Sequence, residues 1–232
     1  MKVAVLGTGV VGKALAGRLA ETGHEVTIGT RDPAATMAVT DPDGYGNPPI
    51  AAWFESHEAV QLKTFSDAAA DAELVINATN GSGSLAALQE AGSSNLRGKV
   101  LIDVSNPLDF SQGFPPTLGV KDTDSLAEQI QRAFPEARVV KSLNTVTASV
   151  MIDPGSVGDG DTTVFAASDD PDAREQVVGL LRELGWKDII ELDGLQNARG
   201  LEMWLPLWVR LLGALGTSEF NIKVVRSAET AQ

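Results

Sequence analysis

Three closely spaced glycines, Gly7, Gly9 and Gly12, form a GxGxxG pattern near the start of the chain. An apolar run at 2–6 precedes them and a helical pattern at 10–22 follows, so they occupy a strand-to-helix turn. Such a turn offers backbone amides and the positive end of a helix dipole to phosphate groups. Gly7 would permit the tight turn, Gly9 the approach of a pyrophosphate, and Gly12 the close packing of helix on strand. The pattern predicts a dinucleotide site at Gly7, Thr8, Gly9, Val10, Val11 and Gly12, the alternative being a tight turn that binds nothing.

The residues that end the second predicted strand bear on which dinucleotide is bound. The stretch IGTRD at 28–32 places Thr30 and Arg31 where an NAD site usually carries a carboxylate for the ribose 2′-hydroxyl. A carboxylate would repel a phosphate on that oxygen, whereas a hydroxyl and a guanidinium would donate to it. Asp32 is expected to cap the turn at Pro33 rather than to reach the ribose. The sequence thus favours NADP over NAD, and a solvated surface arginine is the alternative for Arg31.

Two further polar stretches leave predicted strands at the same edge of the sheet. NATNGSG (77–83) follows the fourth strand and DVSNP (103–107) follows the fifth. Ligands of parallel α/β sheets bind beyond the carboxyl ends of the strands, where small polar side chains and amides suit a ribose and a nicotinamide. The candidate lining residues are Ala78, Thr79, Asn80 and Asn106. A purely structural role in the turns is the alternative for each of the three polar residues.

The elements that must position these residues alternate along the chain. Strands are expected at 2–6, 25–29, 60–64, 73–77, 99–102 and 138–142, with helices at 10–22, 66–71, 84–91 and 125–134. The strands are rich in Val, Ile and Leu without strict alternation, as strands buried on both faces require. Ser125 and Glu128 form a capping box for the last of these helices. The loops at 42–49 and 105–116 are predicted as irregular.

A second set of elements follows a turn-rich link at 153–162. It comprises a strand at 162–167, a helix at 171–184, a strand at 187–191, a largely apolar helical segment at about 195–215, and a short tail. The whole pattern predicts an α/β fold of the Rossmann type, with a doubly wound, mainly parallel sheet and a small C-terminal helical extension. We expect a dinucleotide-binding domain at 1–150 and a C-terminal part at 151–232 that closes the site.

Composition excludes several classes of function. The 232 residues include 18 Lys and Arg against 31 Asp and Glu, a net charge of −13 without any basic cluster, so neither nucleic acid nor a membrane surface is expected as a partner. There is no cysteine, and the two histidines, His24 and His57, are expected to pack or cap, so a Ser-His-Asp hydrolase and a metal site are both poorly supported. No secretory signal precedes the first strand, and the apolar run at 203–216 is short and interrupted. The expected compartment is the cytoplasm.

Three stretches resemble a known family in the same order along the chain. They are KVAVLGTGVVGKALAGRLAETGHEVTIGTRD at the start, RVVKSLNTV after the sixth strand, and NARGLEMWLPLWVRLLGALGTSEFNIKVV near the end. Together they are similar to the NADPH-dependent reductases of the deazaflavin coenzyme F-420. The resemblance implies NADP binding by Thr8, Thr30 and Arg31, and a deazaflavin pocket lined by Leu143, Asn144 and Thr145. It also implies that the C-terminal helix closes the site and forms a homodimer through the run around Trp204, Trp208 and Leu211, with packing inside one subunit as the alternative for those residues.

The chain departs from the family at one candidate position. Where the family's archetypes carry a histidine, this sequence has Asn144, which can donate a hydrogen bond to a ring carbonyl but cannot carry charge. No acid or base is expected, since hydride transfer between stacked rings depends chiefly on orientation, for which Asn106, Asn144 and Thr145 are the candidates. The predicted function is hydride transfer between NADP(H) and coenzyme F-420. The alternatives are reduction of another acceptor, such as a flavin, quinone or imine, and a non-catalytic NADP-binding sensor.

Overall fold

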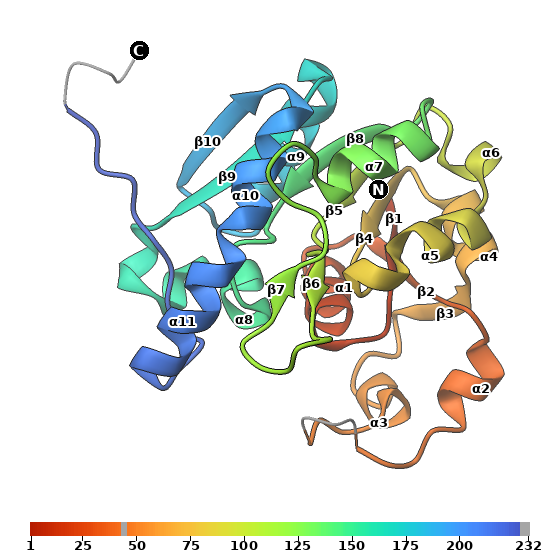
Figure 1. The fold of residues 1–232 in the computed structure, drawn as a ribbon. Helices are drawn as coiled ribbons and strands as arrows, with labels where there is room; N and C mark the ends of the chain where they lie inside the picture. Colours follow the sequence, from red (N-terminus) through yellow and green to blue (C-terminus); the bar gives the residue numbers. More distant parts are fainter. Residues whose placement is uncertain (43–45, 228–232) are drawn as a thin grey trace.

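The computed structural model describes residues 1–42 and 46–227, so the middle of the predicted 42–49 loop lies outside the described residues. Within them an eight-stranded sheet runs in the order β10-β9-β8-β5-β4-β1-β2-β3 (Figure 1). Its strands are β1 (Lys2–Leu6), β2 (Glu25–Thr30), β3 (Gln61–Thr64), β4 (Leu74–Asn77), β5 (Val100–Asp103), β8 (Arg138–Ser142), β9 (Thr163–Ser168) and β10 (Asp188–Asp193). Neighbouring strands pair in parallel except β8 and β9, which are antiparallel. The predicted mainly parallel Rossmann-type sheet is confirmed, and β9 and β10 extend it beyond residue 150.

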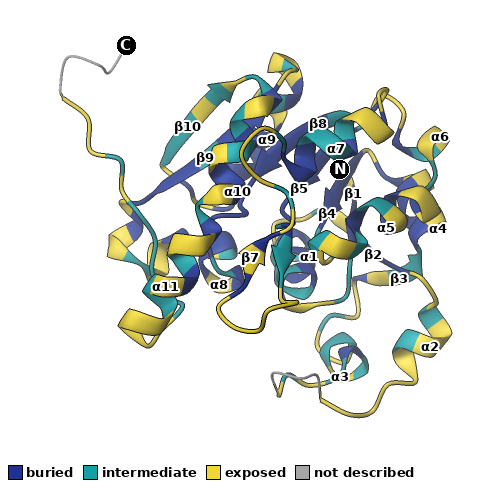
Figure 2. Cartoon of the chain, viewed as in Figure 1, coloured by how far each residue is buried: buried dark blue, intermediate teal, exposed yellow. Residues whose placement is uncertain are grey.

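Helices cover both faces of the sheet and enclose two apolar cores. The core on one face includes residues from α1 (Val10–Glu21), α8 (Ala148–Ile152) and α9 (Pro171–Glu183). The core on the other face includes residues from α4 (Phe65–Asp71), α5 (Ser84–Ala91) and α7 (Leu126–Ala133). In Figure 2 the central strands are buried while the outer faces of the helices are exposed. The strands therefore lack polar alternation because both of their faces lie against helices.

The helix ends follow local chemistry. Helix α9 starts after Asp170, whose side chain accepts from the Ala173 amide, with Pro171 in the first turn and Arg182 in the last. Helix α7 starts at the predicted box, where Ser125 Oγ accepts from the Glu128 amide at 3.1 Å. The second half of that box differs from the prediction. The Glu128 carboxylate accepts from the Ser125 hydroxyl at 2.7 Å and from Nε and Nη2 of Arg199, instead of reaching the Ser125 amide.

Several short elements were not foreseen, because segments of two to five residues are too short to carry a periodic pattern. They are α2 (Pro33–Met37), α3 (Ile50–Phe54), α6 (Ser93–Leu96), α8, the 3₁₀ turns η1 (Gly81–Gly83), η2 (Pro154–Ser156) and η3 (Gly158–Gly160), and the strands β6 (Leu108–Asp109) and β7 (Thr117–Leu118). Strands β6 and β7 form an antiparallel hairpin, with β6 inside the predicted loop at 105–116 and β7 directly after it. The hairpin stands beyond the carboxyl ends of β4 and β5 (Figure 1).

The C-terminal segment consists of three short helices and a tail (216–227) that is hydrogen-bonded to the sheet. They are η4 (Leu195–Asn197), α10 (Ala198–Met203) and α11 (Leu205–Leu215), with Pro206 in the first turn of α11, where a missing amide hydrogen is harmless. The tail lies against the start of β9, since Thr163 N donates to Ile222 O at 2.8 Å and Val224 N to Thr163 Oγ1 at 2.9 Å. No helix in the described ranges has the length and apolarity needed to span a bilayer.

Candidate functional site

The glycine turn has the geometry that its spacing predicts. Gly7 has a φ of +120°, and a Cβ there would lie 2.6 Å from Ala78 O, so only glycine is compatible. A Cβ on Gly12 would overlap the carbonyl oxygen of Gly7. Gly9, in contrast, has no atom within 4 Å of where its Cβ would stand, and no side chain caps the helix that begins after it. The turn thus leaves an open face beside uncapped helix amides, which fits a pyrophosphate.

The three residues at the end of β2, Thr30, Arg31 and Asp32, form hydrogen bonds or ion pairs within the chain. Thr30 is buried and shares a hydrogen bond of 2.8 Å with the hydroxyl of Thr36. Arg31 is 73% exposed, and its Nε lies 3.2 Å from Oε1 of Glu90 on α5. Asp32 caps α2 by accepting from the Ala35 amide at 3.0 Å, so its carboxylate serves the turn as predicted. Glu90 is separated from Arg31 by 59 residues, and no local pattern in the sequence could have identified it.

One cavity of about 200 Å³ brings together five of the predicted residues, Val11, Ala78, Thr79, Asn80 and Asn106, from three parts of the chain, whereas Thr30, Arg31, Asn144 and Thr145 do not line it. Val11 of the glycine turn, the exit of β4 and the exit of β5 line it, with Phe110 from the hairpin at its side. The two exits touch so closely that a Cβ on Gly81 would overlap the carbonyl oxygen of Asn106. The lining residues are Val11, Ala78, Thr79, Asn80, Gly81, Val104, Ser105, Asn106, Leu108 and Phe110, and none of them is ionisable.

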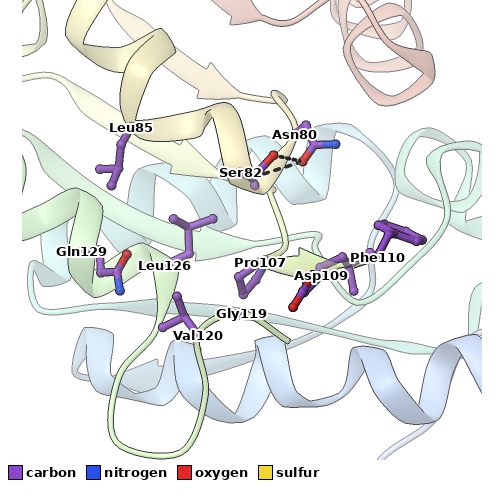
Figure 3. A pocket seen from close by; sticks show the side chains of 12 residues that line it. Asn80, Ser82, Leu85, Pro107, Asp109, Phe110, Gly119, Val120, Leu126 and Gln129 are labelled. Atoms are coloured by element: carbon purple, nitrogen blue, oxygen red, sulfur yellow. Dashed lines mark hydrogen bonds between the residues drawn. The ribbon is translucent and has the colours of Figure 1, made fainter. Parts of the chain in front are cut away.

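The polar side chains at the β4 exit also have structural partners. Thr79 Oγ1 donates to Asn77 Oδ1 at 2.6 Å, and Asn80 Oδ1 accepts from the Ser82 amide at 3.1 Å (Figure 3). Their side chains therefore hold the turn in shape. All three residues line the cavity, and a role of Ala78, Thr79 and Asn80 in cofactor binding stays a prediction.

A larger cavity of about 560 Å³ adjoins the first and shares Asn80, Gly81, Leu108 and Phe110 with it. Figure 3 shows its wall, formed by the turn after β4, the hairpin and the start of α7. Asp109 is its one ionisable lining residue, and hydrogen bonds from Ser111 lower the pKa of that carboxyl. The cavity was not foreseen from the sequence because the two strands of the β6–β7 hairpin that encloses it were not predicted.

Asn106, after the end of β5, and Asn144, after the end of β8, are joined by two hydrogen bonds. Asn106 Nδ2 donates to the Asn144 carbonyl at 2.9 Å, and Asn144 Nδ2 donates to Asn106 Oδ1 at 2.9 Å and to the Leu201 carbonyl at 3.0 Å. The backbone carbonyl of Leu201 can only accept, so it settles which end of the Asn144 amide is the nitrogen. Both amide hydrogens of Asn144 are therefore used within the protein. The predicted donation to a ring carbonyl has no hydrogen left in this arrangement, and the Oδ1 atom is the group without a partner among the described residues.

The neighbours of Asn144 are also unusual. Leu143 is a buried non-glycine residue with a φ of 61°, a left-handed conformation that costs free energy and that concentrates at functional sites. Thr145 is buried, and within the described chain its Oγ1 has no hydrogen-bond partner. Its carbonyl accepts from Trp204 Nε1 at 3.3 Å, while Trp208 stacks on Phe220 with ring centroids 5.3 Å apart. Both tryptophans thus have contacts inside this chain.

A buried ion cluster lies under the candidate site and was missed by the sequence analysis. Lys141, with no exposed side-chain surface, lies 2.7 Å from Asp103 Oδ2 and 2.9 Å from Glu202 Oε1, and it donates to Ser105 O at 2.5 Å. Burial alone would lower the pKa of Lys141, but the two carboxylates hold it above its ordinary value. Burial raises the pKa of Glu202, against the opposing effect of Lys141.

Glu202 joins this cluster to the start of α7. Its carboxylate accepts from the amides of Leu126 at 2.8 Å and Ala127 at 3.2 Å, so a residue of α10 caps a helix 75 residues earlier in the chain. Helix α10 also carries Arg199, whose guanidinium forms a bidentate ion pair with the Glu128 carboxylate. The loop that carries Asn106 is therefore fixed through Lys141 to both α10 and α7.

The two histidines lie in structural contacts. His24 Nε2 is 3.0 Å from Glu183 Oε2, and the ring of His57 stacks on Trp53 with centroids 3.9 Å apart. Neither residue lines the two cavities described above. Their placement agrees with the packing role expected from the sequence.

Comparison with known proteins assigns the chain to a family. Residues 2–107 match the family model described as NADP oxidoreductase, coenzyme F-420-dependent. The F-420-dependent NADP reductase of Methanothermobacter marburgensis is 33% identical over 91% of this chain and 92% of its own length. A crystal structure from Arthrobacter sp. FB24, assigned in its description to the same type of reductase, is 57% identical and superposes with a TM-score of 0.94 over 97% of this chain and all of that one. Human metalloreductase STEAP2 is 32% identical over 88% of this chain but only 36% of its own length. The chain therefore belongs to the F-420-dependent NADP reductase family and is an NADP-dependent oxidoreductase.

Proposed function

We propose that this protein catalyses reversible hydride transfer between NADP(H) and the deazaflavin coenzyme F-420. The observation that carries the proposal is the pair of adjoining cavities at the carboxyl edge of the sheet. The smaller one joins the glycine turn to the exits of β4 and β5, and the larger one opens beside it under the hairpin. A dinucleotide and a second ring system would meet where the two share a wall. The relatives named for this reaction support the same reading.

The dinucleotide would be held by the chain's own amides and by the β2 exit. Its pyrophosphate would lie on the open face of Gly9 and the first amides of α1, with Thr8, Val10 and Val11 beside it. Thr30 and Arg31 would receive the 2′-phosphate, and the stretch 78–80 would border the nicotinamide ribose. The bound NADP(H) supplies the hydride, and the protein supplies position and exclusion of water.

The lining of the two cavities supports transfer between rings over reduction of a carbonyl. Carbonyl reduction needs a proton donor near the reacting oxygen. Asp109 is the one ionisable side chain along both cavities, and the lowered pKa of its carboxyl makes it a poor acid. Asn106, Asn144 and Thr145 are proposed to orient the acceptor. Asn106 lines the smaller cavity, whereas Asn144 and Thr145 are buried and line neither cavity, so Asn144 would act by holding the Asn106 amide in place.

The direct test is to mix the protein with NADPH and oxidised coenzyme F-420 and to follow the visible absorbance of the deazaflavin. Loss of that absorbance at a rate proportional to enzyme supports the proposal. Human STEAP2 is a metalloreductase, so free flavin with a ferric chelate is the second acceptor to test. Turnover with flavin and none with the deazaflavin would replace the proposed acceptor, and binding of NADPH without turnover of either would favour a sensor.

Arg31→Ala is expected to weaken NADPH binding by about 1.5–3 kcal/mol, the range for hydrogen bonds to a charged group, and to leave NADH nearly unchanged. The reason is that only NADPH carries the 2′-phosphate that the guanidinium would meet. Isothermal titration calorimetry with both cofactors measures the difference. An equal loss for the two cofactors would contradict the assignment of Arg31.

Glu90→Gln is the matched control for that experiment. In the structure Glu90 holds the Arg31 guanidinium and would place a negative charge near the phosphate. Removing this charge is expected to tighten NADPH binding while NADH binding stays the same. A tighter complex with NADPH alone would support a 2′-phosphate site beside Arg31 and Glu90.

We also infer a homodimer formed through α11. Of its eleven residues only Leu205 and Val209 are buried in the chain, whereas Leu207 and Leu215 are 51% and 55% exposed on one side of the helix. Sedimentation equilibrium should then give twice the 24.3 kDa of one chain, and Leu207→Glu should give a monomer. A monomeric wild-type protein at micromolar concentration would dismiss this interface.

A further inference from the structure

A separate groove of about 360 Å³ lies between the β6–β7 hairpin and the C-terminal helices. Its lining is mostly apolar, with Leu118 on the hairpin side and Met203 and Pro206 on the helix side. Two cationic residues, Lys121 and Arg210, line it, and no acidic residue does. The groove therefore combines an apolar floor with positive charge from two different elements.

Neither cation is neutralised by the part of the chain that the structure describes. Lys121 and Arg210 are both exposed, and neither has a hydrogen-bond or ion-pair partner within residues 1–42 and 46–227. Other cations, such as Arg132, Arg138 and Arg199, lie in ion pairs with nearby carboxylates. In a chain of net charge −13, two unpaired cations facing one groove create a local site for an anion.

The groove lies next to the larger cavity of the candidate site along the segment 118–121, although the two share no lining residue. Gly119 and Val120 line that cavity, while Leu118 and Lys121, the residues on either side of them, line the groove. A ligand whose ring occupies the cavity could therefore pass along the segment 118–121 into the groove. The hairpin would separate the ring of such a ligand from its chain.

We propose that this groove binds the anionic chain that extends from the ring of the deazaflavin substrate, an inference that rests on the function proposed above. In coenzyme F-420 the ring carries a ribityl chain that ends in a phosphodiester and carboxylates. The planar fork of Arg210 suits the phosphodiester, and the Lys121 ammonium supplies a point charge for a carboxylate. The apolar floor accommodates the carbon chain between them. Lys121 and Arg210 thus select the complete coenzyme over a deazaflavin without the anionic chain.

The test compares two substrates with the same ring. Steady-state KM values are measured for coenzyme F-420 and for a ribityl deazaflavin without phosphate or carboxylates, using wild-type protein and Lys121→Ala/Arg210→Ala. The double variant is expected to raise the KM for coenzyme F-420 about tenfold, the sum of two exposed charge pairs, and to leave the KM for the shorter substrate and for NADPH unchanged. The KM of the wild type for coenzyme F-420 should also rise with salt, and that dependence should weaken in the variant.

Arg182→Ala is the control. Arg182 is an exposed arginine in the last turn of α9 that does not line the groove, and like Lys121 and Arg210 it has no ion pair in the described residues. The substitution is expected to leave all three KM values unchanged. An unchanged KM for coenzyme F-420 in the double variant, or an equal rise for both deazaflavins, would overturn the assignment of the groove while the proposed reaction stands. Failure of the wild type to reduce either deazaflavin would instead remove the proposed reaction, and this subsite with it.

Discussion

Lys141→Ala is expected to lower the free energy of unfolding by about 3–5 kcal/mol, the cost of leaving buried charges without their partner. Lys141 has no exposed side-chain surface and lies within 3 Å of Asp103 and Glu202, so its loss leaves two carboxylates in the interior without a counter-charge. The hydrogen bond from Lys141 to Ser105 O is lost at the same time. Urea unfolding monitored by tryptophan fluorescence, with wild type and variant at the same pH, measures the difference.

Two further variants separate the buried cluster from a general effect of losing a lysine. Lys63→Ala breaks the exposed pair with Asp71 and is expected to leave the urea midpoint almost unchanged. The triple variant Asp103→Asn/Lys141→Met/Glu202→Gln removes all three charges and should recover part of the stability, because no unpaired charge is then buried. If Lys141→Ala and Lys63→Ala unfold at the same midpoint, the cluster does not stabilise the sheet edge in the way described.

Gly9→Ala is expected to weaken NADPH binding about ten- to a hundredfold, corresponding to ~1–3 kcal/mol of steric overpacking against the ligand, without loss of stability in the free protein. Gly9 has a φ of −74°, which alanine adopts freely, and its added Cβ would meet no protein atom. The methyl group would instead occupy the open face that we assign to the pyrophosphate. Calorimetric titration with NADPH, together with the thermal midpoint of the free protein, gives both quantities.

The other glycines supply the comparison. Gly12→Ala should reduce both binding and stability, because its Cβ overlaps the Gly7 carbonyl oxygen even in the free protein. Gly179→Ala, in the interior of α9 where the Cβ meets open space, should raise stability by about 0.5–1 kcal/mol and leave binding alone. Unchanged NADPH affinity in Gly9→Ala would mean that the phosphates do not lie on this face.

The mainly parallel sheet, the glycine turn and two helix N-caps could be predicted from the sequence alone. These features depend on residues that are close together in the chain: the apolar run before Gly7, the positions of Gly9 and Gly12, and the caps at Asp32 and Ser125. Local backbone geometry depends mainly on neighbouring residues. A run of Val, Ile and Leu without polar alternation indicates a strand that is buried on both faces. The short hairpin β6–β7 was missed because two-residue strands carry no periodicity.

Which ligand contacts each candidate side chain can make depends on partners that meet only in the folded protein. Arg31 has Glu90 as its partner, Asn144 gives both amide hydrogens to Asn106 and Leu201, and Lys141 lies between two carboxylates from different elements. Each of these partners is 38 residues or more away in the chain, so the pairing arises when the fold brings distant strand ends and helices together. The type of a residue limits which hydrogen bonds its side chain can make. Packing against distant segments determines which of those hydrogen bonds form within the protein, and only the remaining donors and acceptors can bind a ligand.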